Sequence, residues 1–393
     1  MKEEIRKLAK KYYTRIKEHR EHLHRHPELS FEEYETSKYI KSTLEQMGLA
    51  ITENIGGGTG LTAELGSGHK VVALRADIDA LPILEAEDRS YRSTNDGVMH
   101  ACGHDVHTSC LLGATYILKE LESQLPCRVR LIFQPGEEKL PGGASLMIED
   151  GVLEDVVAIV GQHVHPDLTV GQIGYGSGYF MASCDELYIT VKGKGGHAAM
   201  PNQVIDPILI SATLIQSLQS IISRKSNPNT PSVLSIGKIN SKGGATNVIP
   251  EEVKMEGTFR TYDEDWRTEA HALIKDMTDA ICKAHGTTAE INIVRGYPSL
   301  YNNPGLTAAV KSGISSYMGN EGTVELTPRM TAEDFSYYSH KVPACFYRLG
   351  TASLDGRNTS AVHTPTFDID HAALEVGAGL MAYVAFQISE QLS

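Results

Sequence analysis

The apolar positions at the start of the chain recur with the period of an amphipathic helix. Residues 2–25 and residues 31–47 both show this spacing, and the polar break "HPELS" separates them. Ser30 ends that break, and its hydroxyl is of the kind that caps a following helix. We therefore predict two helices at the beginning of the chain.

After the second helix, the pattern changes to strands that alternate with helices. Three short strand-like runs come first: "ITENI", "LTAEL" and "KVVALRADID". Nearly continuous apolar runs follow at 127–134 and 155–165, and helical segments precede them at 105–122 and 142–151. Strands that are apolar on both faces and alternate with helices are typical of a mostly parallel sheet covered on both sides. We predict an α/β domain.

From residue 185 a different order of elements begins. The order is strand, helix, two strands, helix and strand: "DELYITVKG", 203–223, "SVLSIGKIN", "EVKMEGTFRTY", 264–285 and "TAEINIVRG". This βαββαβ order is that of a ferredoxin-like domain. The α/β character then resumes and ends in a C-terminal helix at 371–391. We predict a ferredoxin-like α+β domain, 181–295, inserted into an α/β domain formed by 1–180 and 296–393.

The composition is that of a folded chain, and the net charge argues against two classes of binding partner. With 393 residues, 41% of them hydrophobic and 22% charged, the chain is too long for one ordinary core and too apolar to be disordered. The formal net charge of −13, from 36 basic and 49 acidic residues, argues against nucleic acid or an anionic membrane as a partner. A small anionic substrate remains compatible, because a binding site sets its own local field.

The cysteines and the N-terminus indicate the compartment. The six cysteines form no CxxC pair and share no repeated spacing; they are Cys102, Cys110, Cys127, Cys184, Cys282 and Cys345. This favours a reducing compartment over a disulfide framework. The N-terminal helix is charged, and we find no apolar run close to the roughly 18 residues that a membrane span requires. We expect a cytoplasmic protein.

The stretch "VMHACGHDVH" concentrates potential metal ligands. Cys102 and His104 lie two positions apart, directly before a predicted helix, with His100 and His107 beside them. Thiolate and imidazole groups bind zinc, manganese, cobalt or nickel, and the soft sulfur favours zinc or cobalt. The alternative is a histidine that caps the helix next to a buried cysteine.

Further donors follow the ends of other apolar runs. Glu137 and Glu138 follow the run 127–134, and neighbouring side chains of an extended backbone point to opposite sides. One carboxylate could bind metal while the other faces a water molecule; the alternative is a solvated acidic loop. His163 and His165 end the next run, and His363 precedes a proline.

Together these donors point to one site. Ligands of open α/β sheets gather at the carboxyl ends of the strands. Five donors exceed the four that a tetrahedral ion accepts, so two ions with a shared ligand are implied.

Eight motifs occur in the order of a known family. They are "RADIDALP", "HACGHDVH", "QPGEE…GGA", "GQHVHP", "GKGGHAAMP", "NVIP", "GTFRTY" and "HTPTFDID". Over essentially the whole chain, the sequence resembles the metal-dependent aminoacylase/carboxypeptidase family. Its nearest branch contains hippurate hydrolases, N-acyl-amino-acid amidohydrolases and auxin-conjugate hydrolases. The resemblance implies a catalytic α/β domain interrupted by a smaller lid that also forms a homodimer.

The resemblance implies roles for individual residues. The metal ligands would be Cys102, which bridges both ions, together with His104, Glu138, His163 and His363. Glu137 would be the general base and acid. Asp77 stands where relatives outside this branch have a histidine ligand, so we do not assign it as a ligand. Asp79 keeps the place of an acidic residue that orients the site, and its role is left open.

Three residues of the lid are implied as well. His197 would reach across a dimer interface and steady the oxyanion in the partner's active site, while Asn247 and Arg260 would hold the substrate carboxylate. Alternatively, Arg260 forms a surface ion pair and Asn247 forms a turn. His100, His107 and His165 would support the ligands or the fold.

The expected reaction is hydrolysis of the amide bond of an N-acetyl or aromatic N-acyl amino acid, which releases a free amino acid and a carboxylic acid. Two divalent ions (zinc, manganese, cobalt or nickel) would activate water, and Glu137 would carry a proton from that water to the departing amine. A carboxypeptidase or dipeptidase with the same site is the alternative. A non-catalytic relative is disfavoured, because all five ligands and Glu137 are present.

Overall fold

The chain divides into two compact units in the computed structural model, which describes residues 1–243 and 245–392. Unit 1 contains 1–180, 301–327 and the residues from 333 onward, and unit 2 contains 181–300 and 328–332. The chain returns from unit 2 at Tyr301, five positions after the predicted boundary, and then contributes the short segment 328–332 to unit 2 a second time.

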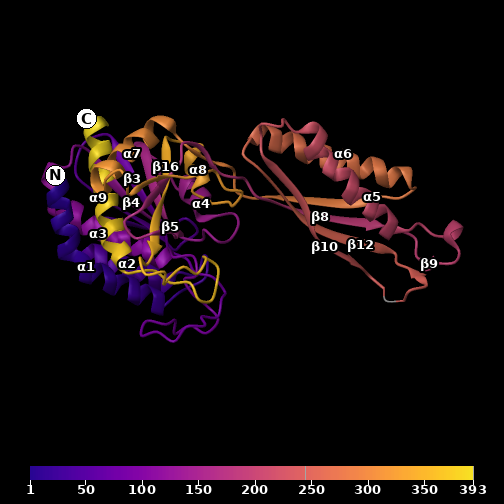
Figure 1. Ribbon diagram of the computed structural model, residues 1–393, viewed down its shortest axis with the longest axis horizontal. Helices are drawn as coiled ribbons and strands as arrows, with labels where there is room; N and C mark the ends of the chain where they lie inside the picture. Colours follow the sequence, from indigo (N-terminus) through magenta and orange to yellow (C-terminus); the bar gives the residue numbers. More distant parts are fainter. Residues whose placement is uncertain (244, 393) are drawn as a thin grey trace. The chain divides into compact units, whose positions relative to one another are not determined.

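Unit 1 is built on an eight-stranded sheet, which confirms the predicted α/β class (Figure 1). In spatial order the strands are β1 (Ile51–Ile55), β2 (Gly60–Leu65), β4 (Arg128–Gln134), β3 (Val71–Asp77), β5 (Val156–Thr169), β16 (Ala344–Ala352), β6 (Ile173–Tyr175) and β15 (Thr323–Glu325). The four central strands, from β4 to β16, run parallel to one another. Every residue of β3 and β16 is buried, as expected for strands covered on both faces.

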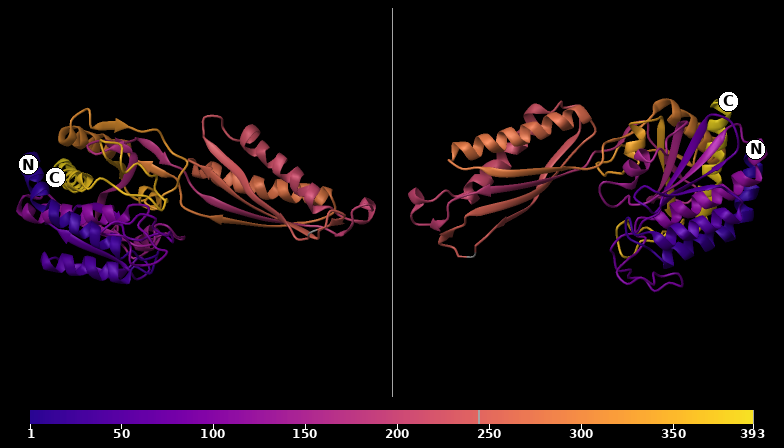
Figure 2. Two further views of the ribbon diagram at one scale, coloured as in Figure 1. Left: turned by 60° about the horizontal axis from the view of Figure 1, so that its bottom comes forward. Right: turned by 180° about the vertical axis from the view of Figure 1, so that it is seen from behind.

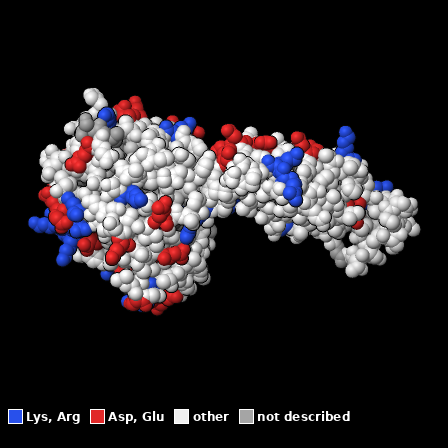
Figure 3. All heavy atoms as spheres, turned by 45° about the horizontal axis from the view of Figure 1, so that its top comes forward, with Lys and Arg blue, Asp and Glu red and all other residues white. Residues whose placement is uncertain are grey.

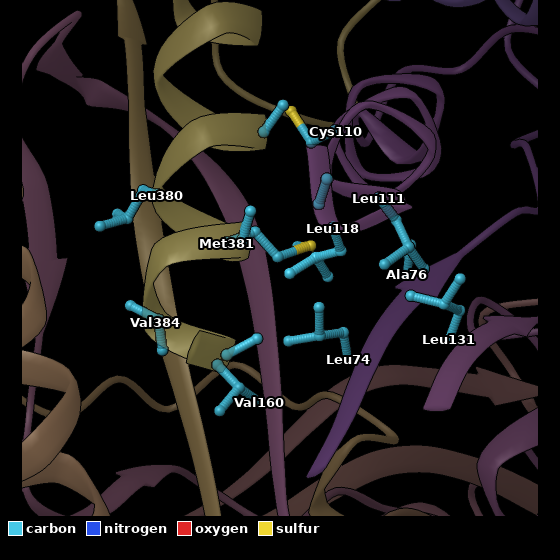
Figure 4. Close-up of a cluster of buried hydrophobic side chains, with 14 of the residues drawn as sticks. Leu74, Ala76, Cys110, Leu111, Leu118, Leu131, Val160, Leu380, Met381 and Val384 are labelled. Atoms are coloured by element: carbon cyan, nitrogen blue, oxygen red, sulfur yellow. The ribbon is translucent and has the colours of Figure 1, made fainter. Parts of the chain in front are cut away.

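Helices provide the cover. They are α1 (Lys2–Arg25), α2 (Tyr34–Gln46), α3 (His104–Glu120), α4 (Gly143–Glu149), α7 (Pro304–Met318), α8 (Ser336–Ser339) and α9 (Ala372–Leu392). The helices α1, α3 and α9 pack on one another, and Figures 1 and 2 show indigo α1 beside yellow α9. Leu111 and Leu118 of α3 meet Leu74 of β3 and Met381 of α9 in the core (Figure 4).

Two sequence-based expectations are wrong. One is that Ser30 caps the second helix, and the other is that no apolar run approaches the length of a membrane span. Helix α2 begins at Tyr34, and Ser30 caps no helix, because a turn that includes Phe31 at a φ of 67° lies between Ser30 and the helix. The segment Ala372–Gln391 within α9 is long and apolar enough to cross a membrane by length and composition. Its 78% burial within the structure is that of the core helix of a globular unit.

Unit 2 has the predicted ferredoxin-like order. Its four-stranded antiparallel sheet has the spatial order β10 (Ser232–Ser241), β12 (Glu252–Thr261), β8 (Asp185–Lys192) and β13 (Ala289–Arg295). The helices α5 (Pro207–Ser220) and α6 (Glu264–Ala284) pack on this sheet. Alternate residues of β8 are buried, which matches a sheet with one covered face.

Short elements complete the chain. They are β7 (Gly178–Met181), β14 (Leu300–Asn302), β9 (Gly196–His197), β11 (Val248–Ile249) and three single turns, Glu122–Gln124, Pro201–Gln203 and Ile221–Lys225. Strand β7 pairs with β14 and β9 pairs with β11. Acidic and basic side chains are interspersed on the face drawn in Figure 3.

Candidate metal centre and active site

Cys102 and His104 lie where a tight loop enters helix α3. His104 is the first residue of the helix, and the preceding Gly103 has a φ of 80°. A Cβ on Gly103 would lie 2.7 Å from a methyl group of Val164, so only glycine allows this close approach. Cys102 is 6% exposed and His104 is fully buried. The loop therefore delivers both side chains to the interior beside β5.

The other donors come from the carboxyl-terminal side of the central strands. Glu137 and Glu138 follow the end of β4, and His163 lies within β5, opposite Arg348 of the parallel strand β16. His363 lies in the segment between β16 and α9 and has a φ of 64°. Non-glycine residues adopt such a conformation rarely, and they cluster at functional sites.

These donors form two groups that share one sulfur atom. Ligand atoms of Cys102, His104 and His163 lie within 4.8 Å of one another, and so do those of Cys102, Glu138 and His363. The Cys102 sulfur lies 3.4 Å from His163 Nε2 and 3.3 Å from His363 Nε2. Ligands of a tetrahedral zinc ion stand about 3.6 Å apart when one is sulfur and one is nitrogen. The spacing therefore suits two neighbouring cations with Cys102 between them.

Hydrogen bonds orient the histidines for such a role. His104 Nδ1 lies 2.9 Å from the backbone oxygen of Asp79 and 3.1 Å from its carboxylate, so this nitrogen donates. His104 Nε2 then faces the other donors, and it has no hydrogen-bond partner among the described residues although it is buried. His163 Nδ1 likewise donates to the backbone oxygen of Val164, at 2.8 Å. Buried polar atoms without partners are costly, and a cation would satisfy them.

The charges of the chain favour the protonated forms of two proposed ligands, Cys102 and His104. Burial, and then the neighbouring Glu138 carboxylate, raise the pKa of the Cys102 thiol well above its usual range. Burial lowers the pKa of His104, but Asp77 and Asp79 outweigh burial and raise it to about 10. A site this rich in anions is completed by positive charge, and bound cations reverse these preferences.

Glu137 lies directly beside the two groups, with its ligand atom within 4.8 Å of those of His104 and Glu138. It is 7% exposed, and its Oε2 lies 4.0 Å from His104 Nε2. Its carboxylate oxygens also lie within 4.8 Å of those of Glu333 and Asp334. Burial, and then the charge of Glu333, raise the pKa of Glu137 well above its usual value. A carboxylate with a raised pKa beside a metal centre is suited to accept and return a proton.

A buried arginine network lies behind Glu137, and sequence reasoning missed it. The guanidinium of Arg75 donates to Asp77 at 2.6 Å, to Glu333 at 3.0 Å, to Asp334 at 2.7 Å and to Gln134 at 2.8 Å. One arginine thus joins strands β3 and β4 to the segment before α8. The signal was Arg75 itself, a charged residue inside the otherwise apolar run "VVALRA".

The neighbouring histidines and aspartates support the centre. Asp77 lies 2.5 Å from His107 Nδ1, and His107 Nε2 accepts the backbone N–H of Val164, at 2.9 Å. Asp77 and His107 thus hold the strand next to His163. His100 and His165 are buried.

The three residues predicted for the lid lie in unit 2. His197 is exposed, and its strand β9 pairs with β11, which begins directly after Asn247. The backbone oxygen of Asn247 accepts the N–H of Ala198, at 2.9 Å. Arg260 is half-buried in β12 and donates to the backbone oxygen of Met330, at 3.0 Å, a different contact from the surface ion pair we considered. Their contribution to a shared active site stays a prediction.

Comparison with known proteins identifies the family. The family model of Peptidase family M20/M25/M40 matches residues 73–387. N-acetyl-L-cysteine deacetylase of Bacillus subtilis is 41% identical over 358 residues, which are 90% of this chain and 83% of that protein. Thermostable carboxypeptidase 2 of Saccharolobus solfataricus is 38% identical over 376 residues, 95% of each chain.

A solved structure shows the same fold. The YXEP protein of Bacillus subtilis, described as a dinuclear metal binding peptidase of the M20 family, is 36% identical to this chain. The two structures align with a TM-score of 0.82 over 97% of this chain and 99% of the other. The resemblance inferred from the motifs is confirmed. The chain belongs to peptidase family M20/M25/M40 and is a metal-dependent amidohydrolase of that family.

Proposed function

We propose that this amidohydrolase cleaves the amide bond of N-acyl amino acids and releases a free amino acid and a carboxylic acid. One observation carries the proposal: the Glu137 carboxylate lies 4.0 Å from His104 Nε2, beside two donor groups that share Cys102. The similarity to a deacetylase of an N-acetyl amino acid supports the substrate class.

The chemistry divides between the cations and the protein. Divalent cations, when bound, lower the pKa of water and polarise a carbonyl group. Cys102, His104, Glu138, His163 and His363 are the proposed ligands. Glu137 takes a proton from the attacking water and delivers it to the amide nitrogen. A neutral amine must leave, so the return of this proton is as necessary as its removal.

The identity of the cations follows from the donors only in part. Thiolate and imidazole favour zinc or cobalt, while carboxylate oxygens also suit manganese, and nickel is compatible with the imidazoles. We propose two such divalent ions in each chain.

The lid residues complete the proposal. His197 from a second copy of the chain would stabilise the oxyanion, and Asn247 and Arg260 would hold the substrate carboxylate, so that a homodimer formed through unit 2 would be the active species. The six cysteines are all free in the structure, which suits the cytoplasmic location that we propose.

A second candidate is a carboxypeptidase or dipeptidase that uses the same site. The 38% identity with a carboxypeptidase over 95% of both chains favours keeping this alternative. The two activities share the metal centre and Glu137 and differ in what the acyl pocket accepts.

A substrate panel tests the proposal. The purified protein, loaded in turn with zinc, manganese, cobalt and nickel, is assayed for amine release from N-acetyl and N-benzoyl amino acids, dipeptides and longer peptides. Higher kcat/KM on the N-acyl amino acids supports the proposal, and higher kcat/KM on peptides supports the alternative. Hydrolysis of none of them by a protein that binds two metals would overturn both. Glu137→Gln serves as the metal-binding, inactive control.

A further inference from the structure

The turn before helix α2 reaches the active-site loop from a distant part of the sequence. Residues 27–33 contain Ser30, which the sequence pattern predicted as a helix cap, and Phe31 and Glu33, which it placed inside the second helix. Leu29 forms a parallel bridge with Ala80, and the N–H of Ala80 donates to the backbone oxygen of Glu28, at 2.8 Å. The turn is therefore docked beside Asp79.

Glu33 holds the backbone directly before Glu137. Its side chain is fully buried, and its Oε1 accepts the N–H of Gly136, at 2.8 Å. Its Oε2 accepts the hydroxyl hydrogen of Thr59, at 2.6 Å, so both oxygens are fixed. The carboxyl group is thus a rigid acceptor for the residue that precedes the proposed base.

Ser30 acts on the other side of Glu137. Its hydroxyl donates to Asp79 Oδ2, at 2.6 Å, and the same oxygen accepts the backbone N–H of Glu138, at 3.0 Å. The other oxygen of Asp79 contacts His104 Nδ1, at 3.1 Å. The loop is therefore anchored at Gly136 and at Glu138, and Glu137 lies between these two anchors.

The turn packs tightly against the active-site loop through Phe31 and Gly136. Gly136 has a φ of 60°, and a Cβ built on it would lie 2.4 Å from the ring of Phe31. Phe31 itself adopts a φ of 67°, which costs free energy in a non-glycine residue. Backbone strain of this kind persists where surrounding contacts enforce it, and here it presses an aromatic ring onto the active-site loop.

We propose that Glu33 is a positioning residue for Glu137: by accepting the amide hydrogen of Gly136 from a fixed, buried carboxyl group, it sets the direction in which the Glu137 side chain projects. The inference rests on the proposed function, because it assumes that Glu137 carries the proton. Errors of about 1 Å in the placement of a catalytic group can lower turnover by about 100-fold.

The variants separate the hydrogen bond from the charge. Glu33→Gln keeps an oxygen that can accept from Gly136, and its amide group can donate to the Thr59 hydroxyl. Burial, and then the charge of Asp79, raise the pKa of Glu33 to about 7, so the carboxyl group takes up a proton near neutral pH and the amide resembles its protonated form. Glu33→Ala removes both hydrogen bonds. Thr59→Val removes only the hydroxyl that fixes Oε2, and its matched control is Thr115→Val, a buried threonine whose hydroxyl donates within helix α3 at 2.7 Å.

Two kinds of measurement are made on the full-length, metal-loaded protein. The first is kcat and KM on the best substrate of the panel, together with metal content. The second is hydrogen exchange at the Gly136 amide, followed by mass spectrometry, which does not depend on activity. We expect Glu33→Ala to lower kcat about 10- to 100-fold, with KM and metal content close to wild type and faster exchange at Gly136. Glu33→Gln should stay within about threefold of the wild-type kcat.

Other outcomes overturn the inference. Wild-type kcat in folded Glu33→Ala, an equal loss in Glu33→Gln, or unchanged exchange at Gly136 would each do so. If Glu33→Ala fails to fold, Thr59→Val decides: faster Gly136 exchange and lower kcat than in Thr115→Val support the inference, and values equal to those of the control contradict it. An inactive wild-type protein would refute the proposed function, while Gly136 exchange would still test the role of Glu33.

Discussion

His363 Nε2 lies 3.3 Å from the sulfur of Cys102, although 261 positions separate the two residues in the sequence. The same histidine nitrogen lies 3.1 Å from Glu138 Oε1. A loop before α3, a loop after β4 and a segment before α9 thus meet at one point. Such convergence of soft and hard donors is what a pair of divalent cations requires.

Removal of the proposed base should stop turnover and leave the centre intact. Glu137→Gln keeps the size of the side chain but cannot accept a proton, so we expect kcat to fall about 10²- to 10⁴-fold. Metal content by elemental analysis and the thermal unfolding midpoint should stay close to wild type. Near-normal kcat in this variant would refute the assignment.

Loss of the shared sulfur should weaken both metal positions. Cys102→Ala removes the one atom that belongs to both donor groups. We expect less than one ion to remain per chain after dialysis, measured by elemental analysis. Cys110→Ala is the matched control, because Cys110 is also buried but its sulfur lies 3.9 Å from the backbone oxygen of Leu374, in the helical core. A full metal complement in Cys102→Ala would remove this residue from the ligand set.

The exposed histidine of unit 2 should matter for catalysis alone. His197→Ala should lower kcat about 10²-fold, the order expected for the loss of one oxyanion donor, without change in metal content. Mixing this variant with Glu137→Gln provides a direct test of action across the dimer. Activity should reappear in the mixture, because mixed dimers contain one site with both intact residues. If activity stays absent after subunit exchange, His197 does not act in the active site of the other subunit.

A buried histidine of helix α1 should make stability depend on pH. His19 is 7% exposed and lies between Tyr39 and Tyr116, with its ring nitrogens 2.7 and 3.1 Å from their hydroxyl oxygens. Burial, and then the charge of Arg15, lower its pKa from 6.5 to about 4. The folded chain therefore keeps His19 neutral, while the unfolded chain takes up a proton below pH 6.5.

The contribution of His19 to the free energy of unfolding is therefore constant above pH 6.5. That free energy decreases as the pH falls from 6.5 towards 4, because the unfolded chain binds a proton that the folded chain does not. The free energy of unfolding should fall by about 1.4 kcal/mol per pH unit over this range, or by about 3 kcal/mol in total. Urea unfolding at pH 7, 6 and 5 should show a shallower pH dependence for His19→Gln than for wild type. His69→Gln, at an exposed loop position, should retain the wild-type slope. Equal slopes in wild type and His19→Gln would contradict this account.

Local pattern predicted the sheet and suggested candidate donors, and the resemblance to the family then singled out the proposed ligands among them. The runs that became β3, β4 and β5 are nearly continuous in apolar residues, and this property marks buried parallel strands. Polar residues at the carboxyl ends of such strands gather at one edge of the sheet, so Glu138, after the run 127–134, and His163, near the end of the run 155–165, were expected to lie close together. Cys102 was a candidate through its position directly before a helix.

The contacts that support the centre could not be predicted in this way. Ser30 and Glu33 are ordinary candidates for helix capping, and Glu333 and Asp334 are ordinary members of an acidic loop. Their functions depend on partners in remote segments, Asp79, Gly136 and Arg75, which no local period reveals. Burial of α9 is a similar case, because its apolar composition alone also suits a membrane span.

The most direct test of the central claim is a crystal structure of the metal-loaded protein with anomalous diffraction data collected at the absorption edge of the bound metal. The account predicts two anomalous peaks about 3.5–4 Å apart in unit 1. Cys102 Sγ should coordinate both, His104 and His163 one, and Glu138 and His363 the other. A single peak, or a pair of peaks that Cys102 does not bridge, would contradict the dinuclear centre proposed here.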